Sequence, residues 1–175
     1  VHYKYIEAAV KVNQVAEVER MVKESNFYDA EKVRDFLMEA KLSDQVPLIV
    51  VCDRHGYVEA LTHYLYKNNL LRYIEVYLQK VNATQTPAVI GALLDDDCNE
   101  DYIKNLLQGV GNACPVAELV DVVEKRNRTK VILNWLEDRI SKDGNVEPAT
   151  HNAMAFICVD LNREPEQFLT TNPYY

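Results

Sequence analysis

Glycine is scarce in this chain of 175 residues: only five glycines occur, and they are scattered along the sequence. Folds built from many short β-strands need glycine at their tight turns, so this shortage disfavours a β-sandwich or a β-barrel. Long apolar runs are missing too, since none approaches the roughly 18 residues that a membrane-spanning helix requires. The chain is nevertheless 48% hydrophobic and 26% charged, which is the balance of a folded globular protein.

Positive charge is also in short supply. Nineteen lysines and arginines stand against 27 aspartates and glutamates, which gives a net charge of −8 at pH 7. Proteins that bind nucleic acid need a basic face for the phosphates, and a bare anionic membrane attracts only basic segments. We therefore expect no nucleic-acid partner and no direct membrane insertion.

The cysteines lack the close spacing of a metal cluster or a disulfide framework. The four cysteines, at Cys52, Cys98, Cys114 and Cys158, include no C-x-x-C pair. This pattern predicts four free thiols in a reducing compartment.

Apolar residues at helical spacing are present from end to end. They form five clear stripes, each two to three turns long: Ala30, Val33, Leu37 and Ala40; Val58, Leu61 and Leu65; Leu71, Ile74, Leu78 and Val81; Val116, Leu119, Val120 and Val123; Ile132, Leu136 and Ile140. A single short amphipathic helix cannot bury its apolar face, so it needs neighbours. The sequence therefore predicts an all-α protein of stacked short helices.

Prolines punctuate the chain at intervals of about one helical hairpin. Pro47, Pro87, Pro115 and Pro148 each precede an apolar helical stretch, where the missing N–H of proline costs nothing. Thr86, just before Pro87, suits a helix N-cap.

Internal similarity supports a repeat. Residues 67–78 align with residues 125–136 at a constant offset of 58 residues, which is two units of about 29. A fixed period of this size is typical of helical hairpins that contact mainly their neighbours. We predict one continuous segment over residues 1–175, a right-handed α-α superhelix of about ten helices in five hairpins. We also expect it to be a fragment of a much longer array.

One segment leaves an alternative open. The β-branched run 47–52 could be a buried strand. Because no second strand of this kind appears and a parallel sheet needs several, a helix is favoured.

Two patterns resemble metal sites. His55, Glu59 and His63 could share one helical face, but Gly56 suggests that a helix starts beside His55, and a Glu59–His63 surface pair is the simpler interpretation. The run 95–99 begins like a calcium loop, yet Glu100 stands where that loop needs glycine and Leu106 where it needs glutamate. We expect instead an acidic loop, with Asn99, Glu100 and Asp101 at the start of the next helix.

A short basic cluster follows at Lys125, Arg126, Arg128 and Lys130, at a predicted turn between helices. Part of it can cap helix carbonyls, and a docking point for an acidic partner remains a second interpretation.

No catalytic motif is present. Gly109 and Gly111 are explained by helix termination, and Trp135 and the tyrosines by packing. We predict no catalytic, cofactor-binding or metal-binding residue and no enzyme activity.

Several runs resemble the clathrin heavy chain family in order and spacing: residues 51–66, 67–81, 86–91, 147–153 and 172–175. The resemblance implies a leg segment of clathrin repeats, from the distal leg, that forms struts of the polyhedral coat in vesicle-mediated transport and endocytosis. The implied partners are other heavy chain legs, with light chain and adaptors bound elsewhere on the full-length chain. The implied location is the cytoplasm, on the cytoplasmic face of coated pits and vesicles. The alternative is a solenoid binding module of a related tethering or sorting complex.

Overall fold

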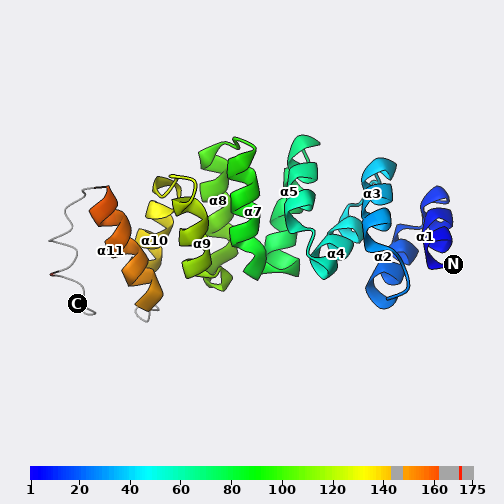
Figure 1. Ribbon diagram of the computed structural model, residues 1–175, viewed down its shortest axis with the longest axis horizontal. Helices are drawn as coiled ribbons and strands as arrows, with labels where there is room; N and C mark the ends of the chain where they lie inside the picture. The colour runs from blue at the N-terminus through cyan, green and yellow to red at the C-terminus, as the bar shows by residue number, and fades with distance from the viewer. Residues whose placement is uncertain (143–147, 162–169, 171–175) are drawn as a thin grey trace. The chain divides into compact units, whose positions relative to one another are not determined.

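The computed structural model describes residues 1–142, 148–161 and 170, and within these ranges the protein is all-α, without a β-strand (Figure 1). Eleven α-helices are described, one more than expected: α1 (His2–Lys11), α2 (Val15–Glu24), α3 (Ala30–Ala40), α4 (Val46–His55), α5 (Val58–Lys67), α6 (Leu71–Val76), α7 (Thr86–Asp95), α8 (Glu100–Val110), α9 (Val116–Glu124), α10 (Lys130–Lys142) and α11 (Pro148–Asp160). The all-α prediction is confirmed. Glu147 and the closing run 172–175 lie outside the described residues.

The chain divides into two compact units, Val1–Tyr77 and Leu78–Tyr175. In the first unit, α2 packs against α1 and α4, and α4 also packs against α3 and α5. In the second unit, α9 packs against α7, α10 and α11, and α10 also packs against α8 (Figure 1). Within each unit a helix therefore contacts the next helix and the one after it, which is the neighbour-to-neighbour packing of an α-solenoid.

A left-handed residue marks the turn inside each of five helical hairpins. Five non-glycine residues have φ between 48° and 57°, and they stand 28, 28, 28 and 30 residues apart: Asn13, Lys41, Asn69, Asp97 and Asn127. At Asn69, for example, the next amide donates to the carbonyl of Leu65 at 2.8 Å, which closes the end of α5. An equivalent bond is present after Asn13, Asp97 and Asn127. In each case the amide of the next residue donates to the carbonyl five residues before it. The repeat predicted from sequence is thus visible in the backbone.

The run 47–52 is helical, as favoured, and forms most of α4. Pro47 sits in the first turn of this helix, and Val51 and Cys52 are 0% exposed. Gly56 ends the helix, with φ of 76°, so the prediction that it begins one is wrong. The reason is its left-handed conformation, which glycine adopts without steric cost and which stops a helix.

Two local predictions at the ends of helices need correction. Thr86 is the first residue of α7 instead of its N-cap, and its hydroxyl donates back to the Ala83 carbonyl at 2.6 Å. Val81, expected on a buried stripe with Leu78, is 43% exposed. The α-helix gives way to a π-helical turn at Tyr77–Val81, and the wider turn rotates Val81 away from the core.

Candidate functional site

The proposed histidine ladder does not form. His55 is the last residue of α4, whereas Glu59 and His63 lie on α5, on the other side of the turn at Gly56. His63 Nε2 lies 3.7 Å from Glu59 Oε1, which confirms the surface pair. His55 faces Tyr28 instead, with its Nε2 3.2 Å from the Tyr28 hydroxyl. Among the described residues, no group of three or more His, Cys, Asp or Glu side chains is arranged to hold a metal ion.

The acidic run 95–99 forms the turn between α7 and α8. Asn99 caps α8, since its side-chain oxygen accepts the Asp101 amide at 2.8 Å. Glu100 and Asp101 lie in the first turn of α8, where the helix dipole favours negative charge. The prediction of an acidic loop that opens the next helix is confirmed.

The basic cluster is largely engaged with acidic groups of the second unit. Arg126 donates twice to the Asp95 carboxylate, at 2.8 Å each, and once to the Val122 carbonyl at 3.0 Å. Arg128 pairs with Glu100 at 2.8 Å, and Lys125 pairs with Asp121 at 2.6 Å. The bonds of Arg126 and Arg128 tie the α9–α10 turn to the α7–α8 turn, which supports the structural interpretation over a docking point.

The Arg126 side chain passes close to Gly91 on its way to Asp95, and this close approach explains why α7 contains a glycine. A Cβ on Gly91 would lie 3.1 Å from Val122 Cγ1 and 3.2 Å from Arg126 Nη2. Gly109, on the exposed side of α8, differs because its Cβ would meet only the amide end of the flexible Gln79 side chain.

These two glycines give a matched pair of substitutions. Gly109→Ala is expected to stabilise the protein by about 0.5–1 kcal/mol, because alanine is the better helix former and Gln79 can move away. Gly91→Ala should not stabilise the protein, because overpacking costs about 1–3 kcal/mol and offsets the same gain in helix propensity. Urea denaturation of both variants measures the difference, and equal stabilities would contradict the close approach at Gly91.

The described part of the second unit has several hollows in its surface, and two of them contain an arginine. One, of about 350 Å³, is lined in part by Trp135, Asp138, Arg139 and Lys142. Arg139 lies over the Trp135 ring and donates to the Asn112 carbonyl at 3.2 Å, which ties α10 to the turn after α8. The other, of about 370 Å³, contains the Arg128–Glu100 pair beside the half-exposed Phe156. In each hollow the arginine therefore links two segments of the fold.

The four cysteines are buried, and among the described residues none of them forms a disulfide, in agreement with the prediction from their spacing. Burial raises the pKa of the Cys52 thiol to about 12, and it raises the pKa of Cys114 to the same value. A thiol with a raised pKa stays protonated at neutral pH, and the protonated form is a poor nucleophile.

Thiol accessibility follows from this burial. With Ellman's reagent at pH 8, we expect Cys52 and Cys114 to stay unreacted in the native protein. All four thiols should react once the protein is unfolded in guanidinium. Rapid reaction of either residue in the native state, mapped by mass spectrometry, would contradict the packing around it.

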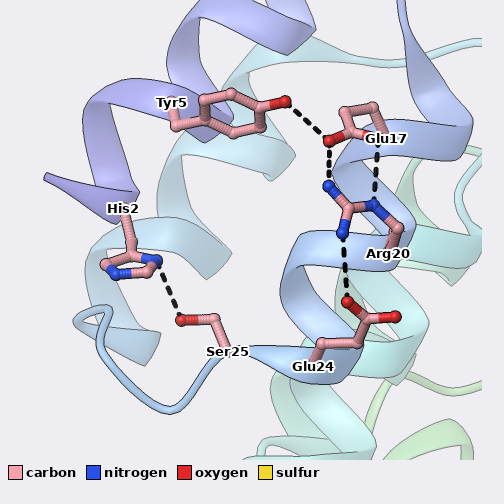
Figure 2. A network of polar contacts seen from close by, with 6 residues as sticks. All are labelled: His2, Tyr5, Glu17, Arg20, Glu24 and Ser25. Carbon is pink, nitrogen blue, oxygen red and sulfur yellow. Dashed lines mark hydrogen bonds and ion pairs between the residues drawn. The ribbon is translucent and has the colours of Figure 1, made fainter.

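A network of polar contacts joins α1 to α2 on the surface of the first unit (Figure 2). The Tyr5 hydroxyl donates to Glu17 at 2.6 Å, and Arg20 bonds both Glu17 and Glu24. The bonds from Arg20 and Tyr5 lower the pKa of Glu17 to about 2, so this carboxylate is ionised at neutral pH. Beside the network, Ser25 Oγ lies 3.2 Å from His2 Nδ1. The spacing of Glu17, Arg20 and Glu24 is a sequence signal for ion pairs on a helix, whereas the link to Tyr5 depends on packing.

No described helix has both the length and the apolarity needed to cross a membrane.

Comparison with known proteins gives consistent results over the whole chain. The family model named Clathrin, described as a region in clathrin and VPS, matches residues 1–101 and 107–175. The clathrin heavy chain of Dictyostelium discoideum is 61% identical over all 175 residues, and that of Drosophila melanogaster is 57% identical. Clathrin heavy chain 2 of Homo sapiens is 58% identical. In each case the chain spans only about a tenth of the relative's length, 10%, 10% and 11%.

Proposed function

The chain belongs to the family of clathrin repeats, the region found in clathrin and VPS, and from that premise we propose that it is a structural strut of a vesicle coat. In this proposal residues 1–175 are one continuous segment of a much longer repeat array, in the distal leg of a clathrin triskelion. The function is mechanical, in vesicle-mediated transport and endocytosis, and involves no catalysis.

The observation that carries the proposal is a regular fold combined with end-to-end similarity to heavy chains. Hairpin turns recur every 28 to 30 residues, and the identity of 57–61% to three heavy chains extends over the full 175 residues. An array of repeats resists bending over a few units yet yields slightly at each interface, which suits a strut in coats of different curvature. The relatives named above are heavy chains, which favours a coat strut over the binding module of a tethering or sorting complex.

The proposed partners are legs of other copies in the assembled lattice, with light chain and adaptors bound elsewhere on the full-length protein. A coat must come apart, so each contact between legs should be weak, and many repeated contacts should supply the strength. The proposed location is the cytoplasm, on the cytoplasmic face of coated pits and coated vesicles.

The test is to place these residues in an assembled coat. Cages formed from the intact protein that carries this chain are imaged by electron cryomicroscopy, and we expect helices α1 to α11 along a cage edge beside a second leg. Failure of the intact protein to assemble, or density for these helices away from the edges, would contradict the proposal. Capture of a single soluble partner by the isolated chain, with a Kd of about 1 μM or tighter, would favour a binding module instead.

A further inference from the structure

We draw no further inference here: the strongest candidate, the hollow of about 350 Å³ between the end of α8 and α10 on the second unit, where Arg139 Nη1 has no hydrogen-bond partner in the described part of the chain, carries nothing because that nitrogen is itself buried out of reach of solvent and nothing in the structure shows what would occupy the hollow.

Discussion

Trp135→Ala is expected to lower the free energy of unfolding by about 3–5 kcal/mol, and Leu78→Ala by about 2–5 kcal/mol, because each removes a large side chain from a packed interior. Trp135 is 6% exposed, on α10, and Leu78 is 0% exposed, in the π-helical turn. Urea denaturation followed by far-ultraviolet circular dichroism measures both losses.

An exposed neighbour provides the control for Leu78. Gln79 lies next to it in the chain and is exposed, with only its flexible amide end near Gly109, so Gln79→Ala should change the free energy of unfolding by less than about 0.5 kcal/mol. A loss of that small size for Trp135→Ala or Leu78→Ala would place that side chain on the surface and contradict the fold around it.

Val51→Asp is expected to destabilise the first unit by about 4 kcal/mol or more, because an aspartate there would be charged and without a partner in the core. Val51 is 0% exposed, within the run that could be mistaken for a strand. Denaturant unfolding, together with the loss of helical signal, is the measurement.

The adjacent valine tests the geometry of the same helix. Val50 is partly exposed on α4, so Val50→Asp should cost about 1 kcal/mol, the ordinary cost of a substitution. In a helix Leu48, Ile49, Val51 and Cys52 share the buried side, whereas in a strand Val50 and Cys52 would share one face. Equal losses at positions 50 and 51 would contradict the helical arrangement.

The sequence predicted the features that depend on residues close together in the chain. Helical spacing predicted the apolar stripes, and it correctly favoured a helix at 47–52 because no second strand was present. The cap at Asn99 and the pair Glu59–His63 each depend on residues at most four apart. Gly56 was assigned to the wrong end of a helix, although a glycine directly after histidine in an apolar stretch is a common stop signal.

Contacts between helices could not be predicted from the sequence. Arg126 and Asp95 are 31 residues apart, so the sequence of the basic cluster did not indicate which carboxylates pair with it. The ring contact between His55 and Tyr28 joins the end of α4 to the α2–α3 loop, 27 residues away in the chain, so no local spacing predicts it. Val81 was predicted incorrectly because a π-helical turn changes the angle per residue, and apolar periodicity assumes that this angle is constant.

The hairpin turns have a consequence for how this chain tolerates change. Asparagine, lysine and aspartate all occupy the left-handed position, yet the distance between these positions varies only from 28 to 30 residues. An α-helix rotates by about 100° per residue. A single residue inserted into a helix would therefore rotate the following apolar side chains by about 100°, away from the helices against which they pack. Chain length between turns is therefore more tightly constrained than the identity of the turn residue, and an insertion inside a helix should be more damaging than most substitutions there.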